Sequence, residues 1–329
     1  MARVYGYEEV HAALPWERLA AVLERAFREG AQVPLRHAHA LSPTDTLLLM
    51  PAWDTELIAT KLVTVIPGAP HTVQASVVVL DRRTGEVRAL MDGEALTLRR
   101  TAATSALAAR RLARPDARTL LIVGSGRLAG WMARAHVALH PGLERVLVWG
   151  RRPEAASVAA QALEAALRQA HPGRSLHVRA VVAAGAREAG GTGPAGGPGG
   201  ALEPAVRTAD IICCATTSTE ALVQGAWLRP GTHLDLVGGF RRDMREVDDE
   251  AVRRSRVVVD TYAGALAEAG DLTQPLERGV IDRAHVRAEL AELLAEPARG
   301  RTSASDITLF KSVGTALEDL AAARCVLEG

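Results

Sequence analysis

The spacing of apolar residues predicts mixed α and β structure in the first third of the chain. Residues 8–29 carry one apolar stripe at helical spacing, which predicts an amphipathic helix with Leu14, Leu19, Val22, Leu23 and Phe27 on its buried face. Four short β-like runs follow, TLLLMPAW, LIATKLVTVIP, QASVVVLD and VRALMDG. Thr84-Gly85 separates the last two runs and predicts a hairpin. Residues 94–113 return to helical spacing and are rich in alanine.

From residue 119 onward, strand and helix patterns alternate. The strand-like runs are TLLIVGSG, RVLVWG, LHVRAVVA, ADIICCATT, THLDLVGG and RVVVD. This alternation is typical of a parallel sheet with helices on both faces. Residues 185–200 are rich in glycine and proline and predict a flexible surface insertion, because they offer little apolar surface to bury. The tail SDITLFKSVGTALEDLAAARCVLEG predicts a turn and then a helix that packs on the N-terminal part.

Composition narrows the class of protein. The 329 residues suffice for two domains, and 48% apolar with 23% charged residues is ordinary for a soluble globular protein. A net charge of +1 gives no bias toward nucleic acid or anionic membranes, so we expect neither as a partner. The polar N-terminus has no signal-peptide pattern, and we expect a cytoplasmic protein. Cys213, Cys214 and Cys325 lack metal-ligand spacing and are expected to be buried thiols.

The segment LLIVGSGRLAGWMAR carries a dinucleotide-binding pattern. Gly124, Gly126 and Ala129 form G-x-G-x-x-A after an apolar strand and at the start of a helix. Gly124 allows the tight turn, Gly126 lets a pyrophosphate approach the backbone, and Ala129 allows close packing of helix and strand. The helix N-terminus supplies N–H groups to the anion.

The end of the next strand indicates which dinucleotide binds. An acid usually stands there in proteins that prefer NAD, where it bonds the ribose 2′-hydroxyl. Here Gly150 is followed by Arg151 and Arg152, and two guanidinium groups can hold a 2′-phosphate. The sequence therefore favours NADP(H), with NAD(H) as the alternative.

Several segments together resemble the ornithine cyclodeaminase/mu-crystallin family. They include VPLRHAHAL, ATKLVTVIPG, CATTS, VGGFRRDMREVD and SDITLFKSVGTALEDL. The stretches RTAATSALAA and LARPDA, directly before the glycine loop, are specific to that family. The resemblance covers nearly the whole chain outside the Gly/Pro-rich stretch.

The resemblance implies a homodimer of two-domain subunits. The expected fold class is α/β, with a Rossmann-type doubly wound parallel sheet and a smaller α+β domain. We expect residues 1–113 with 304–329 to form the smaller domain, for substrate binding and dimerisation. Residues 114–303 are expected to form the Rossmann dinucleotide-binding domain.

The resemblance also implies a set of site residues. Basic residues hold a substrate carboxylate, and the motif positions expected to bind substrate are Arg36, Lys61, Arg100, Ser312 and Val313, with Lys61 catalytic. The cofactor is expected to contact Ser76, Arg100, Gly124, Gly126, Arg127, Leu128, Arg151, Arg152, Thr216 and Val237.

The three cations also make chemical sense by themselves. Arg36 and Arg100 can bind an α-carboxylate through bidentate hydrogen bonds. Lys61 lies in the apolar strand LIATKLVTV, where a buried ammonium is costly without an anionic partner. His37 and His39 would share one face of a strand, but no third ligand accompanies them, so we expect no metal.

One position departs from the ornithine cyclodeaminases. Those enzymes resemble one another in a G-G-D stretch whose aspartate serves amine chemistry, whereas this chain has Phe240 in VGGF. A phenylalanine cannot accept a proton, but it suits an apolar ring. The resemblance therefore points to reduction of Δ1-pyrroline-2-carboxylate or Δ1-piperideine-2-carboxylate to proline or pipecolate. The alternatives are an ornithine cyclodeaminase, an amino-acid dehydrogenase and a non-catalytic NADP-binding protein.

Overall fold

The computed structural model describes residues 2–182 and 200–329, so most of the predicted insertion, residues 185–199, lies outside the described residues. Contacts divide the chain into two compact units. The first is Met1–Thr104 with Gly314–Gly329, and the second is Ser105–Val313. Among the described residues, no helix is long and apolar enough to span a membrane.

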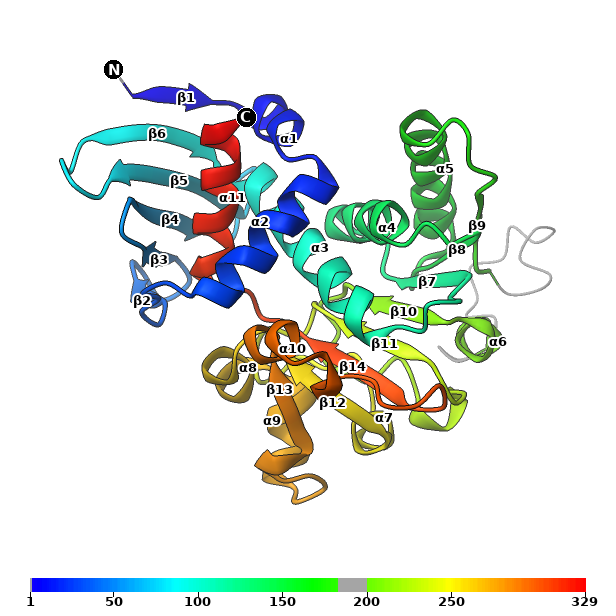
Figure 1. The fold of residues 1–329 in the computed structure, drawn as a ribbon. Helices are drawn as coiled ribbons and strands as arrows, with labels where there is room; N and C mark the ends of the chain where they lie inside the picture. The colour runs from blue at the N-terminus through cyan, green and yellow to red at the C-terminus, as the bar shows by residue number, and fades with distance from the viewer. Residues whose placement is uncertain (1, 183–199) are drawn as a thin grey trace. The chain divides into compact units, whose positions relative to one another are not determined.

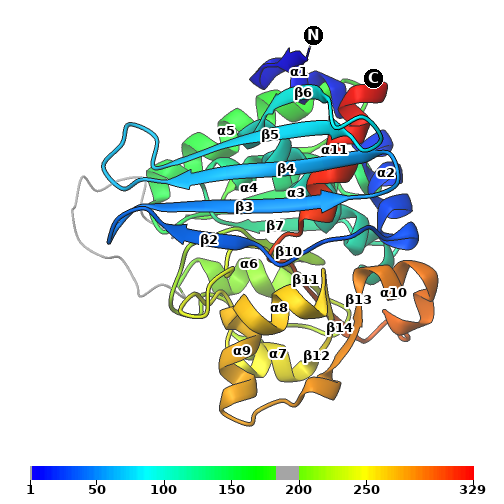
Figure 2. The same ribbon diagram turned by 90° about the vertical axis from the view of Figure 1, so that its left-hand side faces the viewer.

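A six-stranded sheet forms the first unit, and Figure 2 looks onto it. The strand order is β1-β6-β5-β4-β3-β2, and every neighbouring pair is antiparallel except β1 with β6. The bounds are β1 Arg3–Tyr5, β2 His37–Ala40, β3 Thr46–Trp53, β4 Leu57–Val65, β5 Val73–Asp81 and β6 Val87–Asp92. The predicted hairpin is confirmed between β5 and β6, where Gly85 takes a positive φ of 75° in the turn.

Three helices belong wholly to the first unit, α1 (Tyr7–Ala13), α2 (Trp16–Glu29) and α11 (Ala316–Glu328). The prediction of one helix over residues 8–29 is wrong, because the chain breaks at Pro15. Proline has no N–H to donate inside a helix, and Pro15 instead takes an extended conformation as the N-cap of α2. Helix α11 packs against α2, β3 and β4, which confirms that the C-terminal helix returns to the N-terminal part.

The second unit contains an eight-stranded, wholly parallel sheet of order β13-β12-β14-β11-β10-β7-β8-β9 (Figure 1). The strands are β7 Thr119–Val123, β8 Arg145–Trp149, β9 His177–Ala180, β10 Ile211–Cys214, β11 His233–Leu236, β12 Ser255–Val259, β13 Val286–Glu289 and β14 Ile307–Lys311. The helices are α4 Arg127–Leu139, α5 Pro153–Ala170, α6 Leu202–Thr208, α7 Asp249–Arg254, α8 Tyr262–Glu268, α9 Gly270–Glu277 and α10 Leu290–Ala295; α3 (Gly93–Leu112) contains the unit boundary. This arrangement confirms the predicted α/β class with a Rossmann-type sheet.

Strand β14 corrects the prediction for the tail. The segment expected to be a turn is a central strand that pairs with β11 and β12, and all five of its residues are buried. Burial on both faces gives a strand no polar alternation, so this short run was missed.

The unit boundary lies after Val313, not at the predicted 303/304, and the other boundary lies at Thr104 rather than 113.

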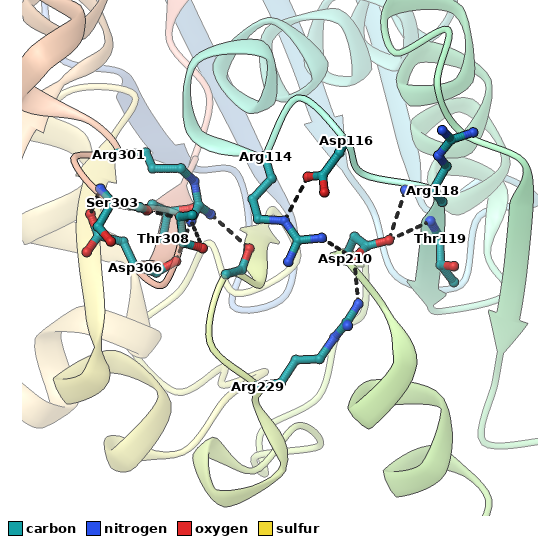
Figure 3. A network of polar contacts seen from close by, with 12 residues as sticks. Arg114, Asp116, Arg118, Thr119, Asp210, Arg229, Arg301, Ser303, Asp306 and Thr308 are labelled. Atoms are coloured by element: carbon teal, nitrogen blue, oxygen red, sulfur yellow. Dashed lines mark hydrogen bonds and ion pairs between the residues drawn. The ribbon is translucent and has the colours of Figure 1, made fainter.

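The side of this parallel sheet at which the strands begin (the amino edge) differs from the side at which they end (the carboxyl edge). At the amino edge, Asp210 accepts hydrogen bonds from the backbone of Arg118 and Thr119, each at 2.9 Å, and pairs with Arg114 and Arg229 (Figure 3). These bonds fix the start of β7 next to β10. Strand β7 has β8 as its neighbour on one side and β10 on the other, so the strand order changes direction at β7, and the connections that follow β7 and β10 leave the carboxyl edge in opposite directions. Such a switch point is where dinucleotides bind in open α/β sheets.

Candidate functional site

The glycine loop after β7 has the geometry of an anion cradle. Gly124 has φ of +136°, and a Cβ there would lie 2.6 Å from the carbonyl oxygen of Ala215, so only glycine fits. Gly126 is the N-cap of α4 and offers no side-chain cap, and a Cβ built on it would meet open space. The N-terminus of α4, where the helix dipole is positive, therefore borders space that can take a phosphate. Ala129 is buried, as close packing of this helix requires.

The end of β8 lies beside the glycine loop. A Cβ on Gly150 would approach Oγ of Ser125 to 2.8 Å, so the two segments touch. Arg151 and Arg152 follow directly and are exposed. Their guanidinium groups make no hydrogen bond or ion pair with any described residue. The side chains of Arg151 and Arg152 therefore lie next to the glycine loop and can bind an anionic ligand.

The remaining cofactor-binding candidates of the second unit gather at the same edge. Arg127 and Leu128 begin α4, Thr216 follows β10, and Val237 follows β11. A Cβ on Gly124 would lie 3.6 Å from Cγ2 of Thr216, so the loops after β7 and β10 are neighbours. The sequence thus identified residues that the fold brings together.

Lys61 forms a buried ion-pair cluster in the first unit. Its Nζ lies 2.8 Å from Oδ2 and 3.0 Å from Oδ1 of Asp319 on α11. Arg100 donates from Nε to Oδ1 of Asp319 at 3.0 Å and from Nη1 to Oε2 of Glu318 at 2.6 Å. Lys61 is 3% exposed and Arg100 5%, while Glu318 and Asp319 are 0% and 1% exposed. Two predicted substrate-binding residues therefore share one carboxylate.

Burial governs the protonation of this cluster. It lowers the pKa of the Lys61 ammonium to about 8, although the carboxylate of Asp319 opposes the shift. Burial also acts to raise the pKa of Asp319, but Lys61 and Arg100 outweigh it and hold that pKa below its usual range. At neutral pH the lysine is charged and close to its pKa, which suits a residue that donates a proton.

Arg36 joins the cluster through Gly314. Its Nη2 donates to the carbonyl oxygen of Gly314 at 3.2 Å, and the side chain is half-buried. Gly314 has φ of +81°, and a Cβ there would lie 2.6 Å from Nη1 of Arg100. Arg36, Lys61 and Arg100 are thus three cations of the first unit connected through Gly314, Glu318 and Asp319.

Ser312 and Val313 are held in the second unit. Oγ of Ser312 and the backbone N–H of Val313 donate to Oδ2 of Asp260 at 3.1 and 2.8 Å. Asp260 is 1% exposed and follows β12. These two substrate-binding candidates therefore do not belong to the same compact unit as Lys61.

Two further candidates have distinct settings. Ser76 on β5 is exposed, and it lies on the sheet face opposite to Lys61, because Lys61 pairs with Val77 and side chains alternate along a strand. Ser76 therefore does not join the lysine cluster within one chain. Phe240 is 41% exposed in the loop after β11, so an apolar ring is presented at the carboxyl edge of the parallel sheet.

Sequence reasoning missed the acids that pair with the predicted cations. Glu318 carries a readable signal, because T-x-x-E in TALE is a capping box. The structure confirms that box at Thr315, while the other oxygen of Glu318 binds Arg100. Asp319 and Asp260 carry no comparable local signal, since their partners lie in distant segments.

The buried thiols are confirmed, and Cys213, Cys214 and Cys325 are free. Burial raises the pKa of Cys213 and of Cys214. Ligand atoms of Cys213, His136 and Asp235 lie within 4.8 Å of one another. A hydrogen bond of 2.8 Å between Nε2 of His136 and Oδ2 of Asp235 accounts for their proximity. The absence of a metal stays a prediction.

Comparison with known proteins gives a consistent result. The model of the ornithine cyclodeaminase/mu-crystallin family matches residues 3–181 and 200–329. A Δ1-pyrroline-2-carboxylate reductase of Paracoccus denitrificans is 37% identical over 303 residues, which cover 90% of this chain and 88% of that protein.

Two solved structures resemble the whole chain. A Thermococcus litoralis Δ1-pyrroline-2-carboxylate reductase in complex with NADH and L-proline has a TM-score of 0.86 and 34% identity, covering 99% of this chain and 96% of that one. An archaeal alanine dehydrogenase dimer with bound NAD has a TM-score of 0.85 and 26% identity, covering 99% and 95%.

Proposed function

The chain belongs to the ornithine cyclodeaminase/mu-crystallin family, and we propose that it reduces a cyclic imine 2-carboxylate with a nicotinamide dinucleotide. The substrate is Δ1-pyrroline-2-carboxylate or Δ1-piperideine-2-carboxylate, and the product is proline or pipecolate. The observation that carries the proposal is the buried Lys61–Asp319–Arg100 cluster in a chain whose relatives include reductases of that imine. It provides both a proton donor and cations for a carboxylate.

The second unit fits the dinucleotide. The open space over Gly126, at the positive end of the α4 dipole, receives the pyrophosphate. Arg151 and Arg152 stand where a 2′-phosphate would bind, so we propose NADP(H) as the preferred form. Neither side chain has a carboxylate to neutralise it among the described residues. When bound, the reduced nicotinamide supplies a hydride.

The substrate is held by charge. Arg36 and Arg100 bind the carboxylate of the substrate, since a guanidinium matches a carboxylate in geometry and charge and both side chains contact Gly314. Ser312 and Val313 are kept in place by Asp260 and add polar and apolar contacts. Phe240 offers an aromatic face to the apolar ring of the substrate.

Lys61 donates the proton that the imine nitrogen gains during reduction. Reduction adds a hydride to the carbon of the C=N bond and a proton to the nitrogen, which gives the secondary amine. The ammonium of Lys61, whose pKa burial lowers to about 8, donates that proton. Asp319 holds the Nζ in position and stabilises its charged form before the transfer.

The test compares substrates in parallel. The protein is supplied with NADPH and either Δ1-pyrroline-2-carboxylate, Δ1-piperideine-2-carboxylate or ornithine, and loss of NADPH absorbance is recorded. Consumption with one or both imines supports the reductase. Ammonia release from ornithine without added NADPH would assign a cyclodeaminase instead, and nucleotide binding without turnover of any substrate would assign a non-catalytic protein.

We also propose a homodimer that forms through the sheet face of the first unit opposite to α11. Alternation along β3 and β4 places on that face Leu47, Leu49, Pro51, Trp53, Ile58 and Leu62, all partly exposed. A contiguous apolar surface of this kind is typical of a subunit interface, and one structural relative was solved as a dimer. Sedimentation of the Leu49→Lys, Leu62→Glu double variant should show a monomer, whereas an unchanged dimer would locate the interface elsewhere.

A further inference from the structure

A buried glutamate joins the two loops at the carboxyl ends of β10 and β11. Oε1 of Glu246 accepts hydrogen bonds from N and Oγ1 of Thr216, at 2.7 and 2.9 Å. Its Oε2 accepts from the backbone N–H of Gly238 at 2.9 Å and of Gly239 at 3.3 Å. Glu246 is 0% exposed, so its carboxylate accepts hydrogen bonds from these four protein donors and from no bulk water.

Two more buried charged residues, Asp271 and Lys311, fix the backbone at Glu246. Oδ1 of Asp271 accepts from the backbone N–H groups of Glu246 and Val247, at 2.7 and 3.2 Å. Oδ2 of Asp271 lies 3.1 Å from Nζ of Lys311 at the end of β14. Asp271 and Lys311 are each 0% exposed. Three strand ends are thereby connected, because β10, β11 and β14 are adjacent in the sheet.

The connected loops lie on one side of the switch point. The glycine loop follows β7, and the adenosine side extends toward β8, where Arg151 stands. The loops after β10 and β11 lie on the other side, where the second half of a dinucleotide rests in this kind of fold. The loop after β11 also carries Phe240.

We propose that Glu246 is a positioning residue that shapes the pocket for the nicotinamide half of the cofactor, with Asp271 and Lys311 fixing its place. This rests on the proposed function for the identity of the cofactor. Glu246 does not touch the cofactor; it sets the separation of the Thr216 loop from the Gly238–Phe240 loop. Burial raises the pKa of Glu246 to about 7, while the charge of Lys311 and the hydrogen bonds from Thr216 oppose that shift and favour the carboxylate.

The substitution Glu246→Gln tests this, because it keeps the size of the side chain and turns one acceptor into a donor. The amide NH2 would face backbone N–H groups, so one loop should move. We expect the dissociation constant for NADH to rise about 10- to 100-fold, the range for hydrogen bonds to a charged group. The dissociation constant for ADP-ribose, which lacks nicotinamide, should change less than about threefold.

Two further variants separate the effect of Glu246 from a general loss of stability. Glu250→Gln, a half-buried carboxylate on α7 that pairs with Arg253, should leave both constants unchanged. Asp271→Asn changes a side chain that holds the backbone of Glu246 and Val247, and it should weaken NADH in the same selective way, which tests the proposal if Glu246→Gln does not fold. Equal weakening of NADH and ADP-ribose, or no weakening of either, would overturn the proposal. Binding needs no imine, so absence of turnover in the unaltered protein would refute the reductase without affecting this result.

Discussion

Lys61 and Asp319 lie 258 positions apart in the chain, yet Nζ of the lysine is 2.8 Å from Oδ2 of the aspartate, and both side chains are almost fully buried. The aspartate also accepts from Arg100. One carboxylate therefore keeps two cations charged in an apolar setting. This arrangement makes the protonation of Lys61 depend on a residue that no local pattern connects with it.

Replacing Asp319 with asparagine should affect both stability and activity. Removing one partner of a buried ion pair costs about 3–5 kcal/mol of unfolding free energy. The pKa of Lys61 should fall below its present value of about 8, because the attraction of Asp319 is lost, and turnover at neutral pH should drop. Denaturant unfolding and a pH profile of kcat measure the two effects. Glu328→Gln, exposed on the same helix, should change neither.

The pH dependence of imine reduction follows from the same lysine. Its folded pKa is lowered to about 8, so the proton is present below that pH and lost above it. We expect kcat to be level near neutrality and to fall about tenfold per unit above pH 8. Lys61→Arg, which keeps its charge, should remove the falling limb from any activity that it retains. A kcat that stays level through pH 9.5 would show that Lys61 is not the proton donor.

Lys61→Met should abolish turnover while nucleotide binding persists. Loss of a general acid typically lowers the rate about 10²- to 10⁴-fold. The glycine loop and α4 belong to the other compact unit, so NADPH affinity should stay within about twofold. Fluorescence titration and stopped-flow absorbance provide the two measurements. A variant with normal turnover would require another proton donor.

Arg151→Ala should weaken NADPH selectively. A lost hydrogen bond between a guanidinium and a phosphate is worth roughly 1.5–3 kcal/mol, or about 10- to 150-fold in affinity. NADH, which lacks the 2′-phosphate, should bind almost as before. Arg168→Ala, an exposed arginine of α5 paired with Glu164, is the matched control. Equal losses for both nucleotides would contradict a phosphate contact.

Phe240→Asp should impair reduction without creating ornithine cyclisation. The new carboxylate would replace a 41% exposed aromatic ring, which we propose to contact the apolar ring of the substrate. We expect the KM for the imine to rise about tenfold, since the substrate would lose roughly 1.4 kcal/mol of apolar contact with a side chain that is only partly buried without it. Assays of NADPH oxidation and of ammonia from ornithine test both statements. Ammonia release by the variant would show that this position alone selects the reaction.

Local signals predicted much of the fold and of the nucleotide site. Strand β7, the Gly124 loop and α4 are consecutive in sequence, so apolar spacing and glycine positions describe them almost completely. Strand β14 was missed because it is five residues long, buried on both faces and free of alternation. Pro15 broke a helix that the apolar stripe alone would continue.

Long-range pairing accounts for what the sequence could not show. Arg36, Lys61 and Arg100 were identifiable by motif, but the pairing of Asp319 with Lys61 and Arg100 was not, since ion pairing over more than 200 positions leaves no periodicity. The same holds for Glu246, whose four donors come from two loops of other strands. A carboxylate in a polar stretch such as RRDMRE gives no indication that it is fully buried.

The return of α11 to the first unit has a consequence for biosynthesis. A nascent chain emerges from the ribosome with its first sheet early, but Glu318 and Asp319 are translated only after the entire second unit. Until then, the carboxylates of Glu318 and Asp319 cannot offset the desolvation of Lys61 and Arg100, so burying these two cations in the first unit is costly. The ion pairs of the first unit therefore form only after the second unit has been synthesised, unlike those of a domain that is contiguous in sequence. A chain truncated before Ala316 would lack both carboxylates, and we expect it to be more sensitive to proteolysis than the full chain.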